Sequence, residues 1–236
     1  MEKVFLEADW RKLVMANYCV DQNILKKYLP HKTEFDLFNG NCYLSLVAFM
    51  FENVKIKGFK IPFHTNFEEV NLRYYVKHKS PEGEWKRGVV FIKEIVPKRA
   101  ITFVANTIYN ENYITMPMAH RWENKNDSLH VKYNWGNKNS FSIEAQNKTI
   151  EIKENSEEEF ITEHYWGYTK INETKTSEYN VQHPRWKVYP VNNFKIESDF
   201  TDVYGKDFSF LKNAVPDSVF LAEGSEIKVL NGQLLK

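Results

Sequence analysis

The chain has few of the residues that build disulfide-linked, fibrous or membrane-spanning proteins. Its 236 residues include 2 cysteines, which are too few for a disulfide framework. With 9 glycines and 8 prolines, it is not a collagen-like or low-complexity chain either. The longest nearly uncharged apolar run, residues 42–51, has about half of the roughly 20 residues that a transmembrane helix needs. We therefore expect a soluble protein without a membrane-spanning helix.

An excess of either charge is also missing. The 32 basic residues nearly balance the 31 acidic ones, whereas proteins that bind nucleic acids through phosphates usually carry a basic excess or a basic stripe. Charged residues interrupt positions 1–9 before the apolar core of a signal peptide forms, so we expect a cytoplasmic protein. The expected partner is a small molecule rather than nucleic acid or a membrane. The oligomeric state stays open, a homo-oligomer included.

The residues that are abundant favour strands. Hydrophobic residues make up 42% of the chain and aromatic residues 15%, enough for a sizeable core. Residues 67–77 alternate, which places Val70, Leu72, Tyr74 and Val76 on one face of a strand and the polar side chains on the other. Residues 85–96 predict a second strand that pairs back as a hairpin. The apolar run 42–51 predicts a strand in the centre of the sheet.

Other segments predict a single domain that spans residues 1–236. Asp21 is a helix cap for residues 22–29, and residues 99–109 predict an amphipathic helix. Residues 156–159 predict a charged turn or helix start, and residues 219–230 a final strand or two. Short strands recur about every dozen residues, as in a sandwich or barrel. They are expected at 129–135, 140–145, 149–153, 164–171, 177–181, 186–190 and 194–197.

Six peptides along the chain are distinctive, at residues 9–11, 15–18, 67–73, 88–97, 158–169 and 183–186. Together they resemble the YqjF-like family of uncharacterised conserved bacterial proteins. The family is similar in fold to acetoacetate decarboxylase. This resemblance implies a mainly β (α+β) fold, namely a single closed or nearly closed antiparallel β-barrel with a few short helices and a central cavity. It implies no agreed activity.

The resemblance also suggests catalytic positions. In acetoacetate decarboxylase a similar strand end carries a glutamate, then a proline and two lysines, of which the first forms a Schiff base and the second lowers its pKa. Carried over, Glu94 is the glutamate, Lys98 is the nucleophile and Arg99 is the neighbouring cation. A cavity-facing acidic residue of that fold matches Glu69 best. The alternative is that Lys98 and Arg99 open a helix on the surface.

Two polar groups are candidate ligand-binding residues. The alternation of residues 67–77 places Asn71, Arg73 and Tyr75 beside Glu69, and an arginine fork suits a carboxylate. That face either lines a cavity or is solvated and carries cross-strand ion pairs. His164, Trp166 and His183 form the second group, since histidine titrates near neutral pH. Core packing is the alternative for each of these three residues.

The sequence contains no motif for a bound metal or cofactor, so we expect neither. The histidines are scattered, and no phosphate-cradling glycine loop or nucleophile elbow is present. Three hypotheses follow: an enzyme that acts on a small keto acid or carbonyl compound, a non-enzymatic ligand-binding protein, and an interaction module with a filled interior.

Overall fold

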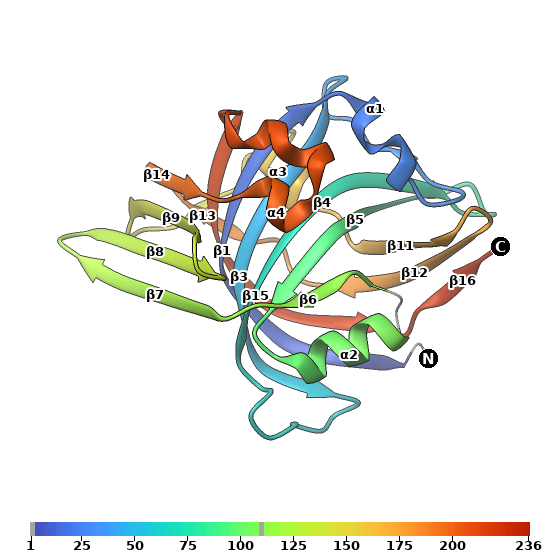
Figure 1. Cartoon of the computed structure of the whole chain (residues 1–236), viewed down its shortest axis with the longest axis horizontal. Helices are drawn as coiled ribbons and strands as arrows, with labels where there is room; N and C mark the ends of the chain where they lie inside the picture. The colour runs from blue at the N-terminus through green and yellow to red at the C-terminus, as the bar shows by residue number, and fades with distance from the viewer. Residues whose placement is uncertain (1–2, 109–110) are drawn as a thin grey trace.

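The computed structural model describes residues 3–108 and 111–236, and this part of the chain is mostly β-structure with a few short helices (Figure 1). A 12-stranded sheet has the order β10-β13-β15-β1-β3-β4-β5-β11-β12-β16, with β2 paired to β4 and β6 to β5. Its strands are β1 (Val4–Val20), β2 (Glu34–Phe35), β3 (Cys42–Ile56), β4 (Phe67–Lys79), β5 (Trp85–Val96), β6 (Tyr113–Thr115), β10 (Ile150–Glu151), β11 (Trp166–Asn172), β12 (Lys175–Gln182), β13 (Lys187–Tyr189), β15 (Ser218–Leu230) and β16 (Gln233–Leu235).

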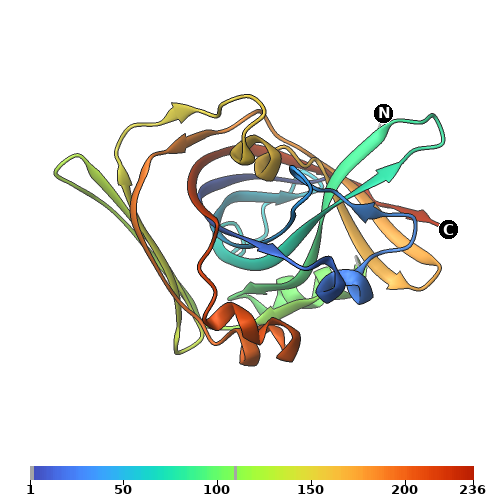
Figure 2. The same cartoon turned by 90° about the horizontal axis from the view of Figure 1, so that it is seen from above.

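The larger sheet curls back on itself, as the view from above shows (Figure 2). Strand β12 pairs with β11 and β16 and also with β15, where Val181 lies opposite Val229 and Gln182 opposite Lys228. The hydrogen-bonded path that begins at β15 and runs through β1, β3, β4, β5, β11 and β12 therefore returns to β15. This curvature gives the sheet an inner and an outer face.

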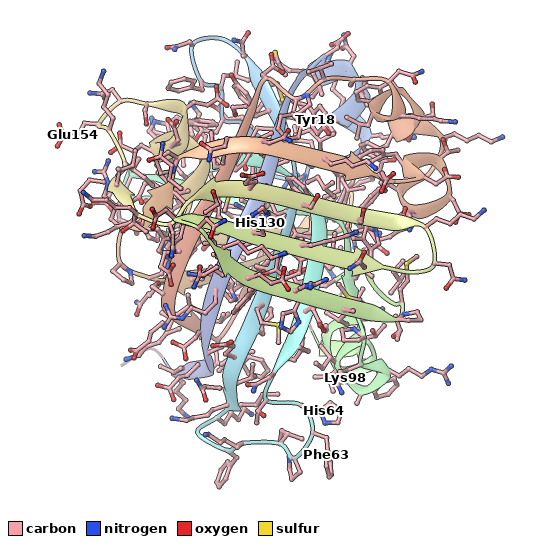
Figure 3. The ribbon with its side chains drawn as sticks, turned by 90° about the vertical axis from the view of Figure 1, so that its left-hand side faces the viewer. Tyr18, Phe63, His64, Lys98, His130 and Glu154 are labelled. Atoms are coloured by element: carbon pink, nitrogen blue, oxygen red, sulfur yellow. The ribbon has the colours of Figure 1, made fainter. Side chains whose placement is uncertain are left out.

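A second sheet covers part of the outer face. It has four strands in the order β14-β9-β8-β7, with bounds β7 (Met118–Lys125), β8 (Ser128–Trp135), β9 (Asn139–Gln146) and β14 (Val191–Glu197). Figure 3 shows these strands in front of the larger sheet. Residues of β8 and β9 such as Val131 and Phe141 belong to one buried cluster with Leu46 and Leu72 of the larger sheet. This cluster is the main core.

Strand β4 separates that core from the inner face, in the register predicted from its alternation. Val70, Leu72, Tyr74 and Val76 are fully buried in the core between the sheets. The polar residues between them are buried too, with exposed fractions of 3% for Glu69, 1% for Asn71 and 7% for Arg73. The alternative of a solvated outer face is therefore wrong.

Short helices lie at the ends of the strands. They are α1 (Gln22–Leu25), η1 (Lys26–Tyr28), α2 (Arg99–Ile108), α3 (Glu157–Thr162), α4 (Phe200–Tyr204) and η2 (Lys206–Lys212). Asp21 caps α1 as predicted, and Ser156 caps α3. The predicted helix 99–109 ends at Ile108, and Tyr109 lies outside the described residues. None of the helices in the described ranges is long and apolar enough to cross a membrane.

Strands β1, β6, β7 and β16 were not predicted from the sequence. Strand β1 was missed because Glu7, Asp9, Arg11 and Lys12 interrupt its apolar alternation, and its pairing with β3 is irregular at these positions. Residues 219–230 were predicted as one strand or two, and β15 spans them as one continuous strand. Gly224 keeps a φ of 81° inside the strand, and a Cβ there would lie 2.0 Å from the carbonyl oxygen of Trp10. Only glycine allows β1 to approach so closely.

Candidate functional site

A cavity of about 460 Å³ lies on the inner face of the larger sheet. Its walls come from eight strands of that sheet, from the loop between β3 and β4, and from α2, which contributes Ile101, Val104 and Ala105. Most of the lining is apolar and aromatic. The polar groups that reach it include Glu69, Arg73, Glu94, Glu111, Tyr113, His164, Tyr179 and His183. An apolar cavity with a few convergent polar groups is the usual form of a small-molecule site.

Three carboxyl groups meet in this cavity. Register places Glu94 of β5 opposite Asn71 of β4 and opposite Tyr113 of β6, so adjacent strands bring Glu69 and Glu94 to one face. Asn71 donates to Glu69 at 3.0 Å, and the Tyr113 hydroxyl donates to the other oxygen of Glu69 at 3.0 Å. Glu111, just before β6, accepts from the Thr169 hydroxyl at 2.7 Å and shares a hydrogen bond with Glu94.

The carboxyl groups resist ionisation because the cavity removes them from water. Burial, followed by the negative charge of Glu111, raises the pKa of Glu69 to about 7. Burial also raises the pKa of Glu111 to about 7. The pKa of Glu94 lies well above its ordinary value, first through burial and then through the charges of Glu111 and Glu69. One Glu94 oxygen has no hydrogen-bond partner among the described residues. Near neutral pH the cluster therefore holds both protonated and ionised carboxyl groups.

Arg73 is a buried cation on the same strand face. Its guanidinium lies over the Tyr75 ring at 5.8 Å, and no carboxylate of the described residues forms an ion pair with it. Its Nε also has no hydrogen-bond partner in residues 3–108 and 111–236. A buried guanidinium without a carboxylate is costly, so a negatively charged ligand would stabilise it.

His164 presents an unpaired nitrogen from the wall formed by the connection between α3 and β11. Its Nε2 lies 3.1 Å from Asp36, which also accepts from Arg87 at 2.6 Å. These two hydrogen bonds outweigh burial and lower the pKa of Asp36, so Asp36 is an acceptor and Nε2 carries the proton. Burial lowers the pKa of His164 to about 4, and its Nδ1 has no partner among described residues. His164 is therefore a neutral acceptor at the cavity.

Aromatic residues complete the wall near His183. The His183 ring stacks on Trp186 at 4.3 Å, and Trp186 lies 6.1 Å from Trp10. The Nδ1 of His183 is 2.9 Å from the carbonyl oxygen of Pro184, and burial lowers the pKa of this ring. Trp166 also lines the cavity and packs under the Lys86 ammonium at 4.1 Å. These contacts give His183 and Trp166 a packing role in addition to their cavity position.

Of the predicted site residues, the structure brings Glu69, Glu94, Arg73, His164, Trp166 and His183 together on the cavity lining. Asn71 and Tyr75 lie behind it: Asn71 holds Glu69, and the Tyr75 hydroxyl hydrogen-bonds to Ser45 at 2.7 Å. Lys98 and Arg99 are not part of the lining.

Lys98 lies where α2 begins. It is half-buried, and its carbonyl oxygen accepts from the amides of Ile101 and Thr102. Its charge, together with the hydrogen bond from His120, lowers the pKa of Glu68. Glu68 belongs to the strand face opposite Glu69, so Lys98 lies outside the carboxyl cluster. Arg99 is exposed. Both residues lie at the start of α2, as the alternative to a Schiff-base site predicted.

Four residues near the site were not predicted as site residues: Glu111, Tyr113, Tyr179 and Asp36. Glu111, Tyr113 and Asp36 lie in short or irregular segments, where no periodic pattern indicates which way a side chain points. Tyr179 lies in the predicted strand 177–181, which is part of β12. Tyr113 follows Glu111 closely and belongs to a strand of three residues. The one available signal was that Glu111, close to Tyr113, is the single acidic residue in residues 95–122.

Comparison with known proteins places the chain among uncharacterised relatives. The sequence pattern of the DUF2071 family, described as "Uncharacterized conserved protein", matches residues 7–226. The uncharacterized protein YqjF of Bacillus subtilis (strain 168) is 25% identical over 201 residues, which cover 83% of this chain and 80% of that protein. The resemblance to the YqjF-like family is thus confirmed.

Solved structures show the same fold at low sequence identity. An acetoacetate decarboxylase-like enzyme from Sphingomonas wittichii RW1 has a TM-score of 0.66 and 9% identity, and the match covers 100% of this chain and 94% of that one. Acetoacetate decarboxylase from Legionella pneumophila has a TM-score of 0.64 and 10% identity, with 98% and 87% covered. The enduracididine biosynthesis enzyme MppR in complex with pyruvate has a TM-score of 0.64 and 11% identity, with 98% and 90% covered.

Proposed function

We propose that this chain, which belongs to the DUF2071 family, binds a small carbonyl compound with a carboxylate group and moves a proton next to the carbonyl. The observation that carries the proposal is the cavity itself. It combines a buried cation without an ion-pair partner among the described residues, Arg73, with three carboxyl groups that titrate far above their ordinary range. Perturbed carboxyl groups in an apolar cleft are a physical signature of acid–base chemistry.

The carboxylate of the ligand pairs with Arg73 in this proposal. The guanidinium has an unpartnered Nε and faces the same cavity as the glutamates. Arginine suits a carboxylate because its planar fork forms two parallel hydrogen bonds. The pairing also orients the ligand, since the remaining polar groups come from other elements, with Glu94 on β5, Tyr113 on β6 and Tyr179 on β12.

The glutamates divide the acid and base roles. Glu94 keeps its proton near neutral pH and donates it to the carbonyl oxygen of the ligand. An ionised carboxylate, Glu69 or Glu111, accepts a proton from the adjacent carbon, and the electrons of that C–H bond form the carbon–carbon double bond of the enol. Reversal of the two transfers restores the carbonyl compound. A pair of carboxyl groups with different pKa values can serve both roles at one pH.

The fold neighbours support a ligand of this class. Among the neighbours, MppR has been solved with pyruvate and with the condensation product of pyruvate and imidazole 4-carboxaldehyde.

We also propose that the chain forms one closed, barrel-like domain around the cavity, because the β12–β15 pairing joins the C-terminal strands to the N-terminal half. The proposed reaction needs no imine, since no lysine of the described chain lines the cavity.

Replacing Arg73 by alanine tests the carboxylate site. Binding of pyruvate and other short keto acids, measured by titration calorimetry, should weaken about 10-fold to 100-fold, the usual effect of losing a charge-assisted hydrogen bond. The melting temperature should change little, because the variant removes an unpaired buried charge. Arg121→Ala on β7 is the matched control and should leave binding unchanged. An Arg73→Ala variant that binds as tightly as the wild type would refute the role of Arg73.

Borohydride reduction tests the imine alternative. Because Lys98 is outside the cavity, we expect no mass adduct on the peptide that contains it after reduction in the presence of pyruvate or acetoacetate. An adduct that disappears in Lys98→Met would establish imine chemistry and overturn the mechanism proposed here.

The second candidate is a ligand-binding protein without turnover. It is favoured by the largely apolar lining, to which Lys98 does not contribute. Proton exchange at the carbon beside the carbonyl, followed by NMR in deuterated water, distinguishes the two functions. Binding that depends on Arg73 without any exchange would establish the second candidate. The open cavity argues against a module with a filled interior.

A further inference from the structure

Large aromatic side chains are exposed at one end of the molecule. Phe59 is 73% exposed and Phe63 is 88% exposed, both in the loop between β3 and β4. On the neighbouring helix α2, Phe103 is 71% exposed. Isolated surface phenylalanines are common, but three on two adjoining elements form a patch that water solvates poorly.

This patch surrounds the entrance of the cavity. The loop contributes Ile61 and His64 to the lining, and α2 contributes Ala100 and Ile101. Among the lining residues in the described part of the chain, Ile61 and Ala100 are the exposed ones. The cavity therefore reaches solvent between the loop and α2. Both elements lie at the lower end of the molecule, and Phe63 projects beyond the ribbon at the tip of the loop (Figures 1 and 3).

The loop backbone holds Phe63 outward at a conformational cost. Phe63 has a φ of 64°, in the left-handed region that a bulky side chain rarely occupies. The turn is held by the amide of His64, which donates to Ile61 at 3.0 Å, and by a 2.8 Å contact between His64 Nδ1 and the Pro62 carbonyl oxygen. Strain that serves to expose an apolar side chain points to a function for that exposure.

The two stretches of chain that carry the patch have charges of one sign. Residues 53–66 contain Lys55, Lys57 and Lys60 and no acidic residue. Residues 95–108 contain Lys98 and Arg99 and again no acidic residue. Lys57 and Lys60 are exposed on the same loop as Phe59 and Phe63. The chain as a whole is nearly neutral, with a formal net charge of +1, so these two stretches are a local departure.

We propose that this mouth face, formed by Phe59, Ile61, Phe63, Phe103, Lys57 and Lys60, docks on the surface of an anionic lipid bilayer. The aromatic side chains enter the interface, and the lysines lie among the headgroups. Exposed apolar side chains beside basic ones, with no acidic residue among them, are the combination that anionic membranes attract. A folded protein partner would need complementary acidic groups and a preformed apolar recess, whereas an anionic bilayer offers both negative charge and an apolar interior without a specific shape.

Docking in this way needs no membrane-spanning segment. A membrane partner was not expected from the sequence, because the chain lacks an apolar run long enough to span a bilayer. Binding to the bilayer surface, however, requires only a few projecting side chains. With the mouth face on the bilayer, the cavity entrance lies at the lipid surface. A carbonyl compound held at the membrane surface would then reach the cavity without crossing water.

Flotation with vesicles tests the proposal on the full chain. Vesicles of phosphatidylcholine with 30% phosphatidylserine should carry the protein to the top of a density gradient, and vesicles of phosphatidylcholine alone should carry much less. The double variant Phe59→Ala/Phe63→Ala should lower the partition coefficient about tenfold or more, since two buried aromatic groups are lost. Lys57→Ala and Lys60→Ala should each lower it about fivefold at low salt, and added salt should weaken the wild-type interaction.

Phe210→Ala is the matched control, since Phe210 is 36% exposed on η2 at the opposite end of the molecule. It should partition like the wild type. All variants replace exposed side chains and should keep the wild-type melting temperature. A wild-type protein that stays at the bottom with both vesicle types would overturn the proposal. So would a dimer in light scattering that Phe59→Ala/Phe63→Ala converts to monomer without any vesicle binding, because a second copy would then cover the patch.

Discussion

Replacing Glu94 by glutamine is expected to slow proton exchange at the carbon beside the carbonyl of a bound keto acid by about 10²–10⁴-fold, the usual contribution of a general acid or base. Glutamine keeps the shape of the protonated carboxyl group but has no acidic proton to donate to the carbonyl oxygen. The measurement is the loss of the NMR signal of the exchanging protons in deuterated water. Glu197→Gln, at an exposed position on β14, is the control and should exchange at the wild-type rate.

The pH dependence of the wild-type rate follows from the same groups. The rate should rise as pH increases through about 7, where Glu69 and Glu111 lose their protons and become bases. It should fall again at higher pH as Glu94 loses the proton that it must donate, which gives a bell-shaped profile. The falling limb should be absent in Glu94→Gln. An exchange rate within threefold of wild type in this variant would show that Glu94 is not the acid.

The stability of Glu94→Gln is a check on folding. A carboxyl group whose pKa is raised in the folded state loses stabilising free energy as pH rises from its ordinary value through the raised one. The pKa of Glu94 is raised well above the ordinary 4.5. Glu94 therefore lowers the free energy of unfolding of the wild type at pH 8 but not at pH 4. The variant should therefore melt at or above the wild-type temperature at pH 8 and close to it at pH 4.

Truncating Leu72 to alanine is expected to lower the free energy of unfolding by about 2–5 kcal/mol, the range for a buried leucine that leaves a cavity behind. Leu72 is 0% exposed, lies opposite Leu46 in the register of β3 and β4, and packs in the core between the two sheets. Urea unfolding at neutral pH, with the slope compared between variants, measures the effect.

Leu234→Ala is the matched control, because Leu234 on β16 is 54% exposed. It should cost less than about 0.5 kcal/mol, as surface substitutions usually do. A cost near zero for Leu72→Ala would contradict the register of β4 described here. Keto acid binding should persist in the folded variant, since Leu72 points away from the cavity.

Strands and their faces were predictable where apolar and polar residues alternate without interruption. Strand β5 was predicted with its observed bounds, and β4 with the side-chain direction of Leu72 and Arg73. Strand β1 was not predicted, although it is the longest at 17 residues, because charged residues at irregular positions hide its period. Its place between β3 and β15 depends on partners that are far away in the chain.

The candidate site was predictable only in part for a related reason. Periodicity placed Glu69 and Arg73 on one strand face, but the alternation is the same whether that face meets water or a cavity. Curvature of the larger sheet and its β12–β15 pairing decided that the face is internal. The position of Lys98 was decided by the turn after β5, which begins α2 beside Glu68 and away from Glu69.

The sequence by itself determined the mainly β class, the amphipathic faces of the central strands and the family, because these depend on composition, local period and long matching peptides. Only the tertiary structure decided which polar residues share a cavity. Glu111 and Tyr113 approach Glu69 and Glu94 through the parallel pairing of β5 with β6, and His164 reaches the same space from beyond α3. The reason is that burial and neighbouring charge are properties of surroundings drawn from distant segments, so the pKa values of these groups shift only after those segments have folded together.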